Sequence, residues 1–295
     1  MNIYDQISTN KRKTIVFMTI FLLLIIALGW MFSQIYDSPL ILFLAIVLSL
    51  IQAYSSYFFG DKIALSISRA KLAEREKNKD IHRIVENLSI TSGLPKPSIY
   101  IIEDQSPNAF ATGRDPKHGS IAVTRGLLEI LDKNELEGVI AHELSHIGNR
   151  DSLLMVVVVV LAGVVAIVSD LFFRIGFFGG FGDDDNSGGS GFGLIFGLVL
   201  AILAPIAAML IQLAISRKRE FMADATGALI TRYPEGLARA LKKISSYNRP
   251  LKFVNDATSM LYISNPRKKR SWLSALFDTH PPVEERIKAL NAMAE

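Results

Sequence analysis

Cysteine is absent from all 295 residues of the chain. Its absence excludes thiol catalysis, disulfide bonds and cysteine-ligated metal sites. Only His and carboxylate side chains remain to hold a metal ion. The chain has five His, so a regularly spaced pair of them is informative.

Charged residues are almost missing from four long stretches, which contain no Lys, Arg or Glu and a single acid, Asp170. Half of the chain is apolar, and its mean hydropathy is +0.31. Each stretch is close to the ~20 residues that cross a bilayer, and none keeps the polar face of a soluble helix. We therefore predict four transmembrane helices, at 14–35, 39–59, 153–173 and 193–215.

The first apolar stretch follows Lys11, Arg12 and Lys13, as it would in a signal peptide. It is longer than a cleaved apolar region, and no small-x-small cleavage site follows it before Asp37. We interpret it as a retained anchor.

Basic residues are distributed unevenly around the four stretches. Arg174 is the only one between the third and fourth, and none lies between the first and second. By the positive-inside rule the remaining segments face the cytoplasm, which predicts a multi-pass plasma-membrane protein with both termini cytoplasmic. This distribution explains the basic pI of 9.2 without a nucleic-acid partner.

The predicted membrane helices divide the chain into four parts. Residues 1–60 form the N-terminal tail and the first two spans, and 61–152 form a cytoplasmic domain. Residues 153–215 form the last two spans with an extracytoplasmic loop, and 216–295 form a helical cytoplasmic part. The loop is rich in Gly and Asp, and we interpret its Asp183–Asp185 triplet as solvated.

Residues 61–152 have the pattern of an α+β unit within a predominantly α protein. Helical periodicity runs from 63 to 90 and ends at a turn at Gly93. Three short β-like runs follow, at 98–103, 109–112 and 120–124. Two predicted helices come after them, one at 125–131 and one around the motif described next.

His142-Glu143-Leu144-Ser145-His146 is the strongest catalytic motif in the chain. Residues four apart lie on one helix face, so both imidazoles can bind one tetrahedral ion, with Glu143 in reach of the attacking water. By composition, accidental matches are expected fewer than ~0.1 times in the chain. Asn134, with Glu137 three residues on, is the predicted N-cap of this helix.

A catalytic zinc usually takes three protein ligands, so a third must come from elsewhere. Glu220 and Asp224 share one helix face, and one could bind the ion while the other accepts the N–H of a ligating His. Spacing alone leaves Glu220 open to another interpretation, a charged helix residue beside Arg217, Lys218 and Arg219.

Four motifs stand in order along the chain: Asn-Ala-Phe-Ala-Thr-Gly at 108–113, His-Glu-x-x-His at 142–146, Ser-Arg-x-Arg-Glu-Phe-x-Ala-Asp at 216–224, and Thr-His-Pro-Pro at 279–282. Together with the four-span layout, over essentially the whole chain, they resemble the HtpX family of membrane-bound zinc metalloproteases. The resemblance implies a zincin-like (gluzincin) catalytic domain with one Zn²⁺ per chain. It implies His142, His146 and Glu220 as ligands, Glu143 as the catalytic residue and Asp224 as the acid that orients a ligand.

The expected reaction is peptide-bond hydrolysis by a zinc-activated water, with Glu143 as general base. Both ligand segments adjoin predicted spans at the cytoplasmic surface, so substrates are expected to be membrane proteins, and the resemblance suggests misfolded ones under stress. His280 and Arg286 are candidate oxyanion donors, with Asn108 a weaker one.

Asn108, Ala109 and Phe110 begin a predicted strand that could pair with an extended substrate if it lies at a sheet edge. A plain sheet strand is the alternative. His82 and His118 have no partner at ligand spacing, and we interpret both as surface residues. The basic run at 267–270 is interpreted as a solvated loop, with contact to anionic lipid headgroups as the alternative.

Two other classes of protein are alternatives to the cytoplasmic-face protease. An intramembrane zinc protease would carry its motif on an apolar helix, whereas charged residues flank this one. A transporter needs ionisable groups inside its spans, and a membrane scaffold does not need a zinc triad with a general base.

Overall fold

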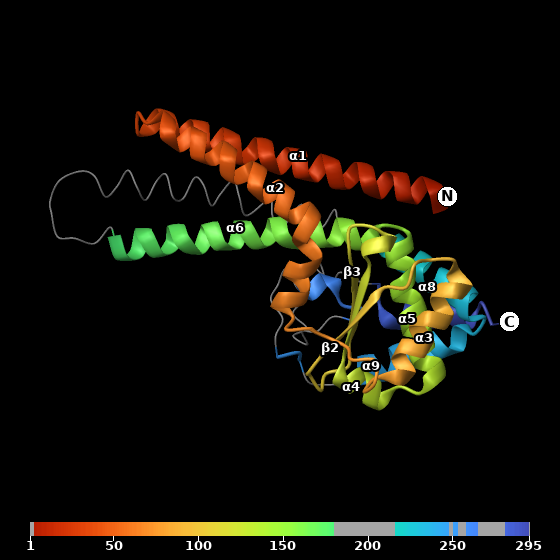
Figure 1. Cartoon of the computed structure of the whole chain (residues 1–295). Coiled ribbons are helices and arrows are strands. Elements are labelled where there is room, and N and C mark those ends of the chain that lie inside the picture. Colours follow the sequence, from red (N-terminus) through yellow and green to blue (C-terminus); the bar gives the residue numbers. More distant parts are fainter. Residues whose placement is uncertain (1–2, 180–215, 248–249, 253–257, 265–280, 295) are drawn as a thin grey trace.

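The computed structural model describes residues 3–179, 216–247, 250–252, 258–264 and 281–294. Within these ranges the chain is mostly helical with one small sheet. Three long helices, α1 (Ile3–Ile35), α2 (Pro39–Ile67) and α6 (Asp151–Gly179), extend to one side of a compact unit of shorter elements (Figure 1).

The first two predicted spans correspond to α1 and α2, which are long and apolar enough to cross a membrane. Large apolar side chains on their outward faces, such as Leu23 and Phe43, are more than half exposed. Helix α5 (Lys133–Gly148) and residues 151–165 of α6 form a further apolar pair, bent by 79°. The described residues therefore hold two candidate spans, or three if this pair counts as one; the predicted span at 193–215 lies outside them.

A four-stranded sheet has the order β1-β2-β4-β3. Strands β2 and β4 are parallel, while β1 pairs with β2 and β3 pairs with β4 in antiparallel fashion. The strands are β1 (Lys71–Leu72), β2 (Ser98–Ile102), β3 (Ala109–Thr112) and β4 (Ser120–Thr124). The three predicted β-like runs match the last three strands, and β3 lies at an edge.

The predicted continuous helix over 63–90 is wrong. Helix α2 ends at Ile67, Arg69 adopts a left-handed conformation (φ 52°), and the chain then forms β1 against β2. Helix α3 (Lys79–Ser92) begins afresh and ends, as predicted, at Gly93, with φ 69°. The apolar spacing continues across the break because α2 and α3 each bury apolar residues separately, whereas both residues of β1 are exposed.

The predicted N-cap of α5 is also displaced. Asp132 caps the helix: its Oδ1 accepts the N–H of Glu135 at 3.0 Å, and Glu135 Oε2 accepts the N–H of Asp132 at 2.9 Å. The sequence offers two capping pairs in which Glu follows an Asp or Asn by three residues: Asp132 with Glu135, and Asn134 with Glu137. The structure uses the first pair, in which the buried Glu135 also binds Lys243 Nζ at 2.6 Å.

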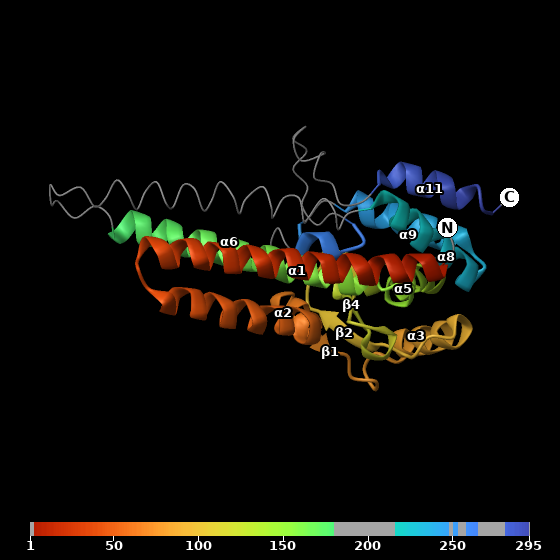
Figure 2. The same cartoon turned by 90° about the horizontal axis from the view of Figure 1, so that it is seen from above.

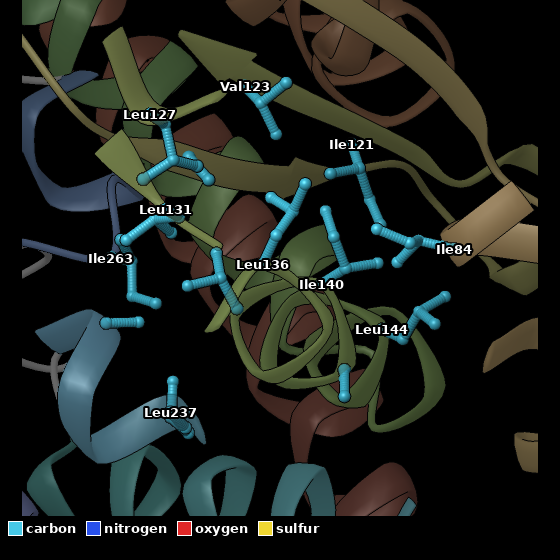
Figure 3. Packing of buried hydrophobic residues seen from close by; sticks show 14 of the residues in the cluster. Ile84, Ile121, Val123, Leu127, Leu131, Leu136, Ile140, Leu144, Leu237 and Ile263 are labelled. Carbon is cyan, nitrogen blue, oxygen red and sulfur yellow. The ribbon is translucent and has the colours of Figure 1, made fainter. Parts of the chain in front are cut away.

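The sheet is buried on both faces because its residues alternate between two hydrophobic clusters. Ile121 and Val123 point toward Leu136 and Ile140 of α5 (Figure 3). On the other face, the strand residues Ile102, Phe110 and Ala122 belong to a second cluster. This cluster also contains Phe17 and Phe21 of α1 and Leu154 of α6. The compact unit is thereby packed directly onto the long helices.

Helix α5 lies between two layers, with the sheet and α3 on one side and α8 (Arg217–Thr231), α9 (Pro234–Ser246) and α11 (Val283–Asn291) on the other (Figure 2). Glycines sit where α5 meets α8 and α9. A Cβ on Gly227 would lie 3.1 Å from the backbone nitrogen of His142, and a Cβ on Gly138 would lie 2.7 Å from that of Leu237. These close approaches bring the polar face of α8 to the His of α5.

We expect Gly227→Val to separate α8 from α5, because the added side chain meets backbone atoms of α5. Overpacking of this kind costs about 1–3 kcal/mol and should also weaken metal binding. Thermal unfolding and metal content of the purified protein measure both effects. Gly163→Ala is the control, since nothing lies within 4 Å of its added Cβ; equal behaviour of the two variants would contradict the packing argument.

Candidate active site

His142 and His146 lie side by side on the face of α5 that meets α8. Their ring centroids are 4.7 Å apart with the planes at 89°, and their Nε2 atoms are 3.1 Å apart. The four-residue spacing places them together, while Val139, Ile140 and Leu144 of the same helix are buried in the hydrophobic core.

Glu220 on α8 completes a cluster of three potential ligands. Its carboxylate oxygens lie 3.7 Å from His142 Nε2 and 3.6 Å from His146 Nε2, and one donor atom of each residue lies within 4.8 Å of the others. Zinc–ligand bonds of ~2.0–2.1 Å in a tetrahedron place donors about 3.3 Å apart. The separations of 3.1 to 3.7 Å therefore fit one small cation.

The other ring nitrogens of both His face carboxylates. His142 Nδ1 lies 2.9 Å from Asp224 Oδ1, in a direction bent away from an ideal hydrogen bond, and His146 Nδ1 lies 3.1 Å from Asp151 Oδ2. These carboxylates favour the proton on Nδ1, which turns the Nε2 lone pairs toward Glu220. Three electron-pair donors thus converge on one point.

The pKa values show that this cluster attracts positive charge. Burial lowers the pKa of His142 to about 4, so that ring is neutral. Burial also acts to lower the pKa of His146, but Asp151 and Glu220 outweigh it and raise the pKa to about 9. Without a cation, a proton on His146 supplies the positive charge, and a bound metal would replace it.

Asp224 forms a bidentate ion pair with Arg286 of α11. Arg286 is fully buried; its Nε donates to Asp224 Oδ2 at 2.8 Å and its Nη2 to Oδ1 at 2.7 Å. Burial alone would raise the pKa of Asp224, but Arg286 lowers it to about 2. Arg286 Nη1 donates to the carbonyl of Ile263 at 3.2 Å. Its role as an oxyanion donor stays a prediction.

Glu143 is buried beside the two His, with 2% of its surface exposed. Burial, with a smaller contribution from Glu220, raises its pKa to about 7. The backbone N–H of Ala111 in β3 donates to its carboxylate, which acts in the opposite direction. A carboxylate with this pKa can both accept and release a proton near neutral pH.

The predicted substrate strand lies at the sheet edge, but its first residues already have partners. The carbonyl of Ala109 accepts the N–H of Ile263 at 2.9 Å. The side chain of Asn108 donates to the carbonyl of Ser264 at 2.9 Å, and Phe110 packs edge-on against Tyr262 with centroids 5.1 Å apart. The binding of substrate by Asn108, Ala109 and Phe110 stays a prediction.

The remaining predicted His lie apart from the ligand cluster. His118 is exposed, with Nδ1 2.8 Å from Asp115, and the Nε2 of the half-buried His82 lies 3.0 Å from the carbonyl of Ala73. His118 is therefore a surface residue, as predicted, whereas His82 is half-buried. His280 lies outside the described residues.

Sequence reasoning missed Asp151, which lies next to His146, and Asn10, which binds Asp151. Asp151 begins α6, and its Oδ1 accepts from Asn10 Nδ2 of α1 at 2.6 Å. The signal available in the sequence was an acid five residues after His146, at the start of an apolar span.

Comparisons with known proteins agree with this geometry. Residues 75–294 match the family described as "Peptidase family M48". A "Protease HtpX homolog" of Thermoanaerobacter pseudethanolicus is 46% identical, over 99% of this chain and 98% of its own length. A protein of the same name from Streptococcus gordonii is 39% identical, over 99% of this chain and 100% of its own length. The crystal structure of S. mikatae Ste24p has a similar fold, with a TM-score of 0.53 and 19% identity, covering 98% of this chain and 67% of that one.

Replacing Arg286 by Met should lower the free energy of unfolding by about 3–5 kcal/mol, because Asp224 would remain buried without its counter-ion. Chemical denaturation of the chelator-treated protein in detergent measures this difference. Arg75→Met is the matched control: Arg75 pairs with Glu86 on the surface, where removal of an ion pair costs below about 1 kcal/mol. Equal losses in both variants would contradict a buried ion pair that stabilises the site.

Proposed function

The chain belongs to the HtpX proteases of peptidase family M48, and from this premise we propose that it is a membrane-embedded zinc endopeptidase with its active site at the cytoplasmic face. The observation that carries the proposal is the convergence of His142, His146 and Glu220 beside the buried Glu143. We propose misfolded membrane proteins as the substrates.

We assign one Zn²⁺ per chain to His142, His146 and Glu220. Two imidazoles and one carboxylate are a ligand set that zinc accepts, and three protein ligands leave a fourth position for water. When bound, zinc would supply a Lewis acid that polarises the scissile carbonyl and makes the attacking water more acidic.

Glu143 is the proposed general base. It accepts a proton from the attacking water and passes that proton to the leaving amine. Its hydrogen bond from Ala111 and its burial between α5 and β3 restrict the directions in which the carboxylate can point.

Asp224 and Arg286 are proposed as positioning residues. Asp224 faces Nδ1 of His142, and Arg286 keeps Asp224 ionised and fixed by two hydrogen bonds. These contacts favour an action of Arg286 through Asp224. For the oxyanion we retain His280, with Asn108 as a weaker donor.

We propose that an extended substrate pairs with β3 at Ala111. Thr124 donates its N–H to the carbonyl of Asn108, so in the antiparallel ladder the backbone groups of Ala109 and Ala111 point away from β4. Ala109 is covered by Ile263, whereas Ala111 lies next to Glu143. Backbone pairing at this position would bring a peptide bond near the base and tolerate varied side chains.

The membrane arrangement supports this choice of substrate. Helix α5 carries the His, and α6, which begins three residues after α5 ends, is apolar and packs beside α1 and α2. We propose four spans, the division at residues 60, 152 and 215, and both termini in the cytoplasm, on the basis of the charge distribution.

Metal analysis of two variants tests the assigned roles. Glu143→Gln should retain one zinc per chain and lose activity by about 100- to 10,000-fold, because the base is gone while the ligands stay. Glu220→Ala should lose the zinc. Elemental analysis and casein degradation in detergent, with and without chelator, give both quantities. Wild-type turnover in Glu143→Gln would refute the mechanism, and full zinc in Glu220→Ala would refute the ligand set.

The pH profile of kcat/KM should fall on the acidic side as Glu143 becomes protonated. Its pKa of about 7 belongs to the metal-free protein, and a bound cation favours the carboxylate, so the acidic limb should lie below 7. Ala111→Pro removes the N–H that lowers this pKa, and proline is tolerated at a strand edge. The limb should therefore move to higher pH in this variant. A uniform loss of activity with an unchanged profile would contradict the contact.

A further inference from the structure

Asp151 connects the second His of the cluster to three other helices. Its Oδ2 lies 3.1 Å from His146 Nδ1 of α5, and its Oδ1 accepts from Asn10 Nδ2 of α1 at 2.6 Å and lies 3.4 Å from Arg219 Nε of α8. Asp151 and Asn10 are 1% and 2% exposed, so water does not compete for these contacts.

An acid at the first residue of a helix is often explained by the helix dipole alone. Here both carboxylate oxygens have specific partners on other helices: His146, Asn10 and Arg219. Asn10 also donates to the carbonyl of Asn149, in the turn between α5 and α6. Asn10 therefore binds the acid and the segment that carries it.

This geometry matches the role that Asp224 has toward His142. Each His has a carboxylate at Nδ1, and each carboxylate has a second donor behind it: Arg286 for Asp224 and Asn10 for Asp151. The difference is the origin of the donor. Arg286 belongs to the compact unit, whereas Asn10 lies on α1, near the start of the candidate membrane span Ile7–Ile35.

We propose that Asp151 and Asn10 are positioning residues for His146, so that the first membrane helix helps to set the metal affinity of the active site. The inference rests on the proposed zinc site. Asp151 fixes the tautomer and the direction of the His146 ring, and Asn10 fixes Asp151. Helix α1 is then a part of the catalytic unit as well as an anchor.

Zinc competition with a chromogenic chelator tests the proposal on the full chain in detergent, in a Glu143→Gln background that cannot degrade itself. Adding Asp151→Ala should raise the Kd for zinc about 10- to 100-fold, the usual effect of removing the partner of a ligating His. Asn10→Leu should raise it by a smaller factor, about three- to tenfold, because Asn10 acts on His146 through Asp151. Cobalt substitution should show an altered visible spectrum for Asp151→Ala.

Ser33→Ala is the matched control. Ser33 is buried on the same helix, 23 residues from Asn10, which is about 34 Å along an α-helix. The Kd for zinc of the Ser33→Ala variant should equal that of the Glu143→Gln background. If Asp151→Ala does not fold, Asn10→Leu keeps both His146 and Asp151 and still decides the question.

The outcomes separate this inference from the function on which it rests. Failure of the Glu143→Gln background itself to bind zinc would overturn the metal site, and with it the proposal. Zinc binding by the background with an unchanged Kd in both Asp151→Ala and Asn10→Leu would overturn only the positioning roles. A lower unfolding temperature of the metal-free variants without any change in Kd would mark Asp151 and Asn10 as structural and would also overturn it.

Discussion

The site depends on the burial of charged groups between α5 and α8. Glu143, Glu220, Asp224 and Arg286 are all less than a tenth exposed, and buried charges persist only where their partners are held in place. The close approach at Gly227 satisfies this condition, since it lets α8 bring two carboxylates against two imidazoles. The local negative charge then attracts a proton or a metal ion. Catalytic chemistry and stability therefore depend on the same contact.

The sheet lies between the site and the long helices and packs against both. Its strands bury one set of side chains against α5 and the alternate set against α6 and α1. The strand that approaches Glu143 through Ala111 is thus held by Phe110 on the membrane side. A shift of α6 relative to α1 would reach the base through the sheet and His146 through Asp151. The long helices and the sheet therefore share one of the two hydrophobic clusters.

Local patterns predicted much of the structure. The strands at β2, β3 and β4, the first two spans and the pairs at 142/146 and 220/224 follow from spacings within a few residues. The break after Ile67 was missed because the apolar spacing runs through it. The pairs Asp224–Arg286 and Asn10–Asp151 join residues 62 and 141 positions apart, and only the folded chain shows such contacts. The cap of α5 was misplaced because the sequence offers two equivalent pairs.

The division of the ligand cluster between α5 and α8 has a consequence during synthesis. His146 is synthesised 74 residues before Glu220, and Arg286, the counter-ion of Asp224, is synthesised 62 residues after Asp224. A partly translated chain carries the paired imidazoles without the third donor, and later carries that donor without a neutralised Asp224. On the proposed ligand assignment, the growing polypeptide therefore lacks a complete metal site, beside its own unfolded segments, until Glu220 has been made.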